Sequence, residues 1–146
     1  MERMQTLLSG AAMLALLVGQ PVAGNAGHIS VQIDSDDSCR VRGSANGVPY
    51  EFIIDTGSSE VWLPLKDAAK LGYSLQQLHK LGQFSSRPRD GQIAAVELRE
   101  LRIGDFVLHD VRASLGEWSG APLIGVWVIK EMKHFQIDGS TCSLSW

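Results

Sequence analysis

The chain has 146 residues, of which 45% are hydrophobic and 20% charged, a composition typical of one compact globular domain. Its formal net charge is −3 and it has no block of basic residues, so nucleic acid and an anionic membrane surface are excluded as implied partners. The 4 histidines are scattered without the spacing of metal ligands, and we therefore predict no metal site.

Residues 1–26 have the pattern of a secretory signal peptide. A basic start precedes a short apolar core over residues 7–18, and small residues follow as far as Gly24 and Ala26, after either of which we expect cleavage. The apolar run is shorter than the ~20 residues that span a bilayer, although residues 7–24 would form an inner-membrane anchor if they stayed uncleaved. We therefore expect an exported protein, periplasmic or secreted, that contacts a membrane only through this segment.

Residues 27–38 form a polar stretch that contains an acidic cluster from Asp34 to Asp37. The cluster lacks the glycine and the downstream glutamate of an EF-hand calcium loop, so a solvated turn is favoured over a calcium site. We predict a flexible lead-in here, followed by a single folded domain over residues 39–146.

The 2 cysteines, Cys39 and Cys142, lie near the two ends of this predicted domain. Export to an oxidising compartment favours a disulfide between them, which would join the ends of the fold. Two free buried cysteines, or a link between two chains, remain as alternatives.

From Cys39 onward the pattern is mostly that of short strands. Asn46-Gly47 is the turn signal of a β-hairpin whose second strand, residues 50–54, leads directly to Asp55. Short helices are expected over residues 65–72 and 74–82, a mobile hairpin around 83–98, and further strand pairs over 98–115 and 135–144. We therefore predict a mainly β fold, a small closed barrel with one or two short helices.

Asp55 ends the apolar strand Phe52–Ile54 and is followed by the small residues Thr56, Gly57 and Ser58. A carboxylate at the buried end of a strand requires hydrogen bonds. Gly57 lets the backbone turn and aim its N–H at the carboxylate, and the two hydroxyls can donate further bonds. We interpret Asp55 as catalytic, although the same residue types are also common in ordinary surface turns.

The sequence Asp55-Thr56-Gly57-Ser58 resembles the active-site signature of the aspartic proteases. Around it lie an N-G-x-P hairpin turn, a D-A-x-x-L-G segment at Asp67–Gly72, a polar hairpin and a late apolar-apolar-Gly motif. This order resembles the single-domain, retroviral-type (retropepsin-like) proteases, and especially the bacterial exported members. The resemblance covers residues 39–144.

The resemblance implies a role for each residue of the motif. Asp55 would be the catalytic carboxylate, and Thr56 would bond across a dimer axis. Gly57 would donate its N–H to the carboxylate, and Ser58 would bond its outer oxygen. Two further segments are implied: a supporting layer of Leu123, Ile124 and Gly125 beneath the loop, and a flap tip near Gly91 and Ile93.

The number of motifs predicts the assembly. Aspartic protease chemistry needs two carboxylates that share one proton, and this chain has one Asp-Thr-Gly, because Asp90-Gly91 and Asp138-Gly139 lack the intervening residue. Two chains must then meet with their Asp55 residues together. The expected function is a homodimeric aspartic endopeptidase that hydrolyses peptides or proteins without a cofactor. The alternative is a protease-like module that binds peptides or assembles with partners without hydrolysis.

Overall fold

The computed structural model describes residues 27–88 and 90–146. The predicted signal segment, residues 1–26, lies outside the described residues. Within the described part, no helix is long and apolar enough to cross a bilayer.

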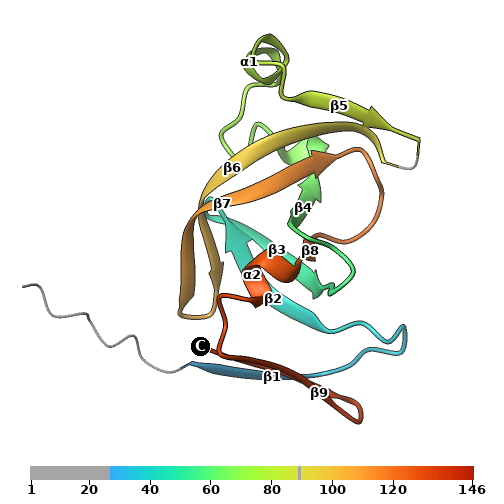
Figure 1. Ribbon diagram of the computed structural model, residues 1–146, viewed down its shortest axis with the longest axis vertical. Coiled ribbons are helices and arrows are strands. Elements are labelled where there is room, and N and C mark those ends of the chain that lie inside the picture. Colours follow the sequence, from blue (N-terminus) through green and yellow to red (C-terminus); the bar gives the residue numbers. More distant parts are fainter. Residues whose placement is uncertain (1–26, 89) are drawn as a thin grey trace, which may run out of the picture.

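The described elements are mostly strands, and two α-helices and one 3₁₀ helix (η1) connect them (Figure 1). In chain order they are β1 His28–Gln32, β2 Arg40–Ala45, β3 Val48–Ile54, β4 Val61–Pro64, η1 Leu65–Asp67, α1 Leu75–Lys80, β5 Phe84–Arg87, β6 Gly91–Ile103, β7 Phe106–Gly116, β8 Leu123–Ile124, α2 Val126–Ile129, β9 His134–Asp138 and β10 Thr141–Ser145.

Six strands close into a barrel. They are hydrogen-bonded in the order β2-β3-β8-β4-β7-β6, and β6 also pairs with β2 through Ala45 and Leu101, so the sheet returns to its first strand. Strand β5 continues the sheet beyond β6, outside the closed circle. The predicted mainly β closed barrel is therefore confirmed. Its interior is filled by fully buried side chains, among them Phe52, Leu63, Leu98, Leu101, Ile103, Leu115 and Ile124.

The hairpin that leads to Asp55 forms as predicted. Asn46 and Gly47 have φ values of 48° and 81°, the left-handed conformation that a tight two-residue hairpin turn requires. The Asn46 side chain also accepts a hydrogen bond from the Arg99 N–H at 2.8 Å and donates to the Leu71 carbonyl at 2.8 Å. One turn residue thus fixes the β2–β3 hairpin against both β6 and the segment after η1.

The predicted helices are only partly observed. Helix α1 lies within the second predicted helix, and the Ser74 side chain accepts a hydrogen bond from the Gln77 N–H at its start. In the segment 65–72, the predicted short helix is limited to η1, Leu65–Asp67, which turns follow as far as residue 72. Its Asp67 is buried and accepts hydrogen bonds from Tyr50 Oη and Lys70 Nζ, each at 3.1 Å. Burial, together with the bond to Asp67, raises the pKa of Tyr50.

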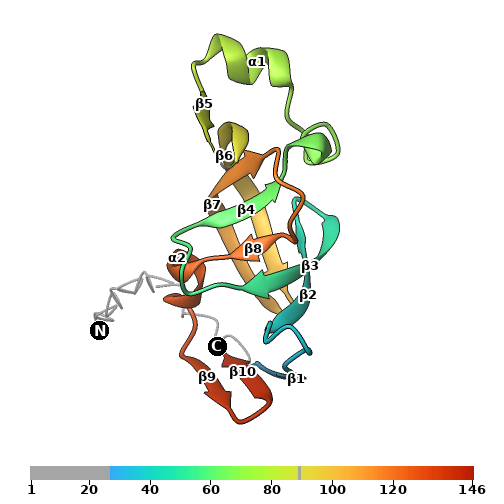
Figure 2. The same ribbon diagram turned by 90° about the vertical axis from the view of Figure 1, so that its right-hand side faces the viewer.

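A separate three-stranded sheet, in the order β1-β10-β9, lies at one end of the barrel, and α1 and β5 lie at the other (Figures 1 and 2). Strand β1 falls within residues 27–38, so the flexible lead-in predicted there was wrong for His28–Gln32. Alternating side chains explain the strand, because Ile29 and Val31 pair with Leu144 and Cys142 of β10 and pack against the core.

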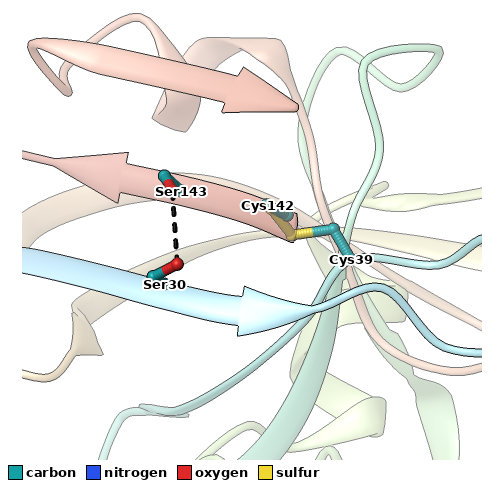
Figure 3. The surroundings of a disulfide bond; sticks show 4 residues. All are labelled: Ser30, Cys39, Cys142 and Ser143. Atoms are coloured by element: carbon teal, nitrogen blue, oxygen red, sulfur yellow. Dashed lines mark hydrogen bonds between the residues drawn. A yellow bond between two sulfur atoms is a disulfide. The ribbon is translucent and has the colours of Figure 1, made fainter. Parts of the chain in front are cut away.

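A disulfide joins Cys39, which precedes β2, to Cys142 in β10 (Figure 3). This confirms the predicted pairing, and no free cysteine lies among the described residues. The two Cα atoms are 5.9 Å apart and the cysteines are separated by 103 positions in sequence. Because a link across so long a loop restricts the unfolded chain, we expect it to stabilise the fold by about 2–4 kcal/mol.

Candidate active site

Asp55 lies directly after β3, at the start of an exposed loop. Its backbone N–H donates to the Ile124 carbonyl at 2.9 Å, which continues the pairing between β3 and β8. Its side chain is half-buried, and Oδ1 accepts the Gly57 N–H at 2.8 Å. The Ser58 N–H closes the turn by donating to the Asp55 carbonyl at 3.2 Å. The carboxylate is therefore held at the start of the loop, and one of its oxygens is oriented by a backbone N–H donor.

The motif Leu123-Ile124-Gly125, to which the resemblance assigns a supporting layer, lies against this loop. Strand β8 runs parallel to β3, and Figure 2 shows β8 between β3 and β4. After β8 the chain turns into α2, whose first N–H groups, those of Val126 and Trp127, donate to the Ser58 and Ser59 carbonyls at 2.8 and 2.9 Å. The free N–H groups at the start of a helix thus find their acceptors in the Asp55 loop.

Gly125 is required here by space rather than by backbone conformation. A Cβ built on Gly125 would lie 2.5 Å from the Glu60 carbonyl oxygen, 2.6 Å from the Glu60 nitrogen and 2.7 Å from the Ser58 carbonyl oxygen. All three are backbone atoms of the active-site loop, so they cannot move aside as a flexible side chain would. The glycine therefore permits the close contact on which the position of the loop depends.

The structure gives a hydrogen-bond partner for the Ser58 hydroxyl and shows that Thr56 is exposed. The Ser58 hydroxyl donates to the Glu60 carbonyl at 3.2 Å, and not to the outer Asp55 oxygen as the resemblance implied. Its role here is to close the loop on itself. Thr56 is exposed, so its hydroxyl is accessible on the surface next to Asp55.

Glu60 is a loop residue that the sequence did not indicate. Its carboxylate accepts a hydrogen bond from the hydroxyl of Ser114, a buried residue of β7, at 2.7 Å. This bond attaches the end of the active-site loop to a barrel strand 54 positions away in sequence. No local pattern marks such a pair, because the partner becomes a neighbour only when β4 and β7 align.

The predicted flap corresponds to the hairpin of β5 and β6. Gly91 starts β6 next to the turn and has a φ of 64°. Ile93 lies further inside the strand, where it is 4% exposed and pairs with both Ser85 and Gly116, so its side chain is buried rather than at the tip. Of the two residues predicted at the flap tip, Gly91 is therefore the one beside the turn.

A groove of about 660 Å³ is formed by the end of β4, η1, the start of α1 and the loop after β7, and its lining does not include Asp55. It is lined by Pro64, Leu65, Lys66, Leu75, Gly116, Glu117, Trp118, Ser119 and Gly120. In a single chain Asp55 thus lies outside this groove. Among the described residues, no group of three or more His, Cys, Asp or Glu is arranged to hold a metal ion.

Comparisons with known proteins found a matching family, a related sequence and a similar solved structure. The aspartyl protease family matches residues 41–134. An uncharacterized protein from Rickettsia prowazekii (strain Madrid E) is 26% identical over 133 residues, which are 90% of this chain and 57% of that protein. The chain thus spans little more than half the length of this curated relative.

Among solved structures, the crystal structure of a retropepsin-like aspartic protease from Rickettsia conorii aligns with a TM-score of 0.70 and 25% sequence identity. The alignment covers 83% of this chain and 90% of that one. The matched family region includes both the Asp55 loop and the Leu123-Ile124-Gly125 motif beneath it. The chain therefore belongs to the aspartyl protease family and has a retropepsin-like fold.

Proposed function

We propose that the protein is an aspartic endopeptidase that acts as a homodimer, with one Asp55 from each chain in the catalytic dyad. The observation that carries this proposal is the Asp55 carboxylate, oriented by the Gly57 N–H at 2.8 Å in a loop that Gly125 supports from beneath. A carboxylate that is positioned by backbone atoms and half-exposed to solvent can bind and activate water.

A homodimer is supported because a single chain provides only one of the two carboxylates that the reaction needs. The chemistry requires a second carboxylate ~3 Å from the first, because two such groups then share one proton. The sequence contains one Asp-Thr-Gly motif, and the described residues form one barrel that carries it. Exposed Thr56 and Gly57 beside Asp55 provide a surface on which a second copy of the loop can pack.

In the proposed reaction the ionised Asp55 takes a proton from a bound water, which attacks the carbonyl carbon of the scissile peptide bond. The protonated Asp55 of the other chain donates a hydrogen bond to the carbonyl oxygen as the tetrahedral intermediate forms. Collapse of the intermediate breaks the C–N bond, and a proton passes from the dyad to the leaving amine. The dyad ends with one shared proton, as it began.

Assembly into a dimer predicts how the cleavage rate depends on enzyme concentration. If the active species is a dimer in equilibrium with inactive monomers, cleavage of a denatured protein substrate should rise with about the square of enzyme concentration below the dimer dissociation constant. Above this constant it should become linear. The measurement is the initial rate over about 100-fold in enzyme concentration, compared with sedimentation of the same samples. A strictly linear rate across a range in which sedimentation detects monomers would contradict the proposal.

A further inference from the structure

The hairpin β5–β6 extends past the end of its neighbour β7. The last pair of the β6–β7 ladder is Ile93 with Gly116, where β7 ends, while β6 continues back to Gly91. The Gln92 N–H therefore has no strand carbonyl beside it. It donates instead to the side chain of Glu117, whose Oε2 lies 2.8 Å away. A carboxylate thus takes the place of the missing strand and provides a charge-assisted hydrogen bond.

The same carboxylate lies against the backbone of Gly91. A Cβ built on Gly91 would be 2.4 Å from Glu117 Oε2 and 3.1 Å from Glu117 Cβ. Any side chain at position 91 would therefore displace Glu117 from Gln92. Gly91 also has a φ of 64°, so the two constraints, backbone conformation and space, act on the same residue.

A second contact attaches the other strand of the hairpin. The guanidinium carbon of Arg87, at the end of β5, lies 5.9 Å from the centroid of the Trp62 ring, within the range of a cation–π contact. Trp62 in turn meets Trp118 edge to face, with ring centroids 5.4 Å apart and an interplanar angle of 82°. Glu117 and Trp118 are adjacent, so both strands of the hairpin are connected to one short loop.

That loop leads directly to the support of the active site. It joins β7 to β8, whose Leu123 pairs with Ile53 of the strand before Asp55 and also with Trp62 of β4. The attachments of the hairpin are therefore located on β4, which follows the Asp55 loop, and on the loop that leads into β8. Two of the attached residues, Glu117 and Trp118, also line the groove of about 660 Å³. A shift of the hairpin would therefore change the shape of this groove without contacting the carboxylate of Asp55.

We propose that Glu117 is a positioning residue that anchors the β5–β6 hairpin through the Gln92 N–H, and that this anchor sets peptide affinity rather than the chemical step. The inference rests on the proposed peptidase function for its effect on affinity. The anchor itself is a property of the fold and can be measured without catalysis.

The first test is hydrogen exchange at the Gln92 amide, with near-UV circular dichroism of the Trp62–Trp118 pair as a second signal. Glu117→Ala removes the acceptor and should speed Gln92 exchange by about tenfold. Glu117→Gln keeps a side-chain oxygen acceptor and should restore most of the protection. The tryptophan signal should weaken in the alanine variant if the loop loses its attachment. Unchanged exchange at Gln92 in Glu117→Ala would overturn the proposal.

Gly91→Ala is an independent variant with a matched control. It should displace the carboxylate and speed Gln92 exchange as Glu117→Ala does, and the double variant should show little further increase, because both changes break one contact. Gly139→Ala is the control, since Gly139 has a φ of 57° and no atom within 4 Å of a built Cβ. It introduces similar backbone strain far from the hairpin and should leave the exchange rate of the Gln92 amide unchanged. If the two substitutions had additive effects on the free energy of exchange at Gln92, the proposal that both break one shared contact would be contradicted.

The functional test separates KM from kcat. Glu117→Ala should raise KM by about five- to tenfold with kcat within about twofold of the wild type, and Glu117→Gln should lie close to the wild type. A loss of kcat at unchanged KM would overturn the role in affinity. Absence of cleavage in the wild type would instead contradict the peptidase function, whereas the exchange result would still decide whether Glu117 anchors the hairpin.

Discussion

Asp55→Asn should lower the rate of peptide cleavage by roughly 10³-fold, because an amide can neither take a proton from water nor share one with its partner. The fold should be preserved. Asp55 is half-buried, and the asparagine Oδ1 can still accept the Gly57 N–H that the carboxylate accepts at 2.8 Å. The measurement is the initial rate on a denatured protein substrate, together with the melting temperature of both proteins.

The matched control for this variant is Asp138→Asn, which makes the same chemical change at an exposed position in the β9–β10 hairpin. It should leave both the rate and the melting temperature unchanged. Equal cleavage by the wild type and Asp55→Asn would remove Asp55 from the mechanism. Negligible cleavage by both folded proteins would favour a module that binds peptides without hydrolysing them.

Gly125→Ala should have the largest effect on stability of any single added methyl group near the site. The new Cβ would have to occupy space 2.5–2.7 Å from backbone atoms of Glu60 and Ser58. Relief requires the Asp55 loop to move away from α2, which breaks the hydrogen bonds from Val126 and Trp127 to that loop. We expect a loss of about 3 kcal/mol, and a melting temperature lower by roughly 10–15 °C.

Gly139→Ala again provides a control, because its cost is limited to backbone strain of about 1 kcal/mol at a φ of 57° with open space around it. The comparison therefore separates crowding from the general cost of replacing glycine. Cleavage by Gly125→Ala should also fall by at least about tenfold at a temperature where the protein is still folded, since the carboxylate is displaced with its loop. A stability equal to that of the wild type would show that Gly125 does not determine the position of the loop.

Local sequence signals predicted the parts of the fold that depend on neighbours in sequence. Asn46-Gly47 specified a hairpin turn because few residues other than asparagine and glycine adopt its positive φ angles. The small residues after Asp55 predicted a tight turn, which the Ser58 N–H closes by donating to the Asp55 carbonyl at 3.2 Å. The disulfide between Cys39 and Cys142 is an exception, because it joins residues 103 positions apart and was predicted from an even pair of cysteines in a chain expected to be exported.

Apart from this disulfide, the features below, which depend on distant partners, were not predicted from the sequence. Residues 28–32 form a strand because they pair with β10, more than 100 positions away, and their own composition gave only a weak signal. The Glu60–Ser114 bond and the Glu117–Gln92 bond also join distant segments. The run after Gly125 is apolar and resembles a strand, yet it forms α2 because its first N–H groups donate to the Asp55 loop.

The most direct test of the shared dyad is cleavage by mixtures of wild-type protein and Asp55→Asn at constant total concentration, above the dimer dissociation constant and after subunit exchange. If each site needs one ionisable Asp55 from each chain, only wild-type homodimers are active, and an equal mixture should retain about one quarter of the wild-type rate. The rate should then follow the square of the wild-type fraction. A linear decline, with about one half of the rate in the equal mixture, would mean that each chain acts by itself and would contradict a dyad formed across the dimer.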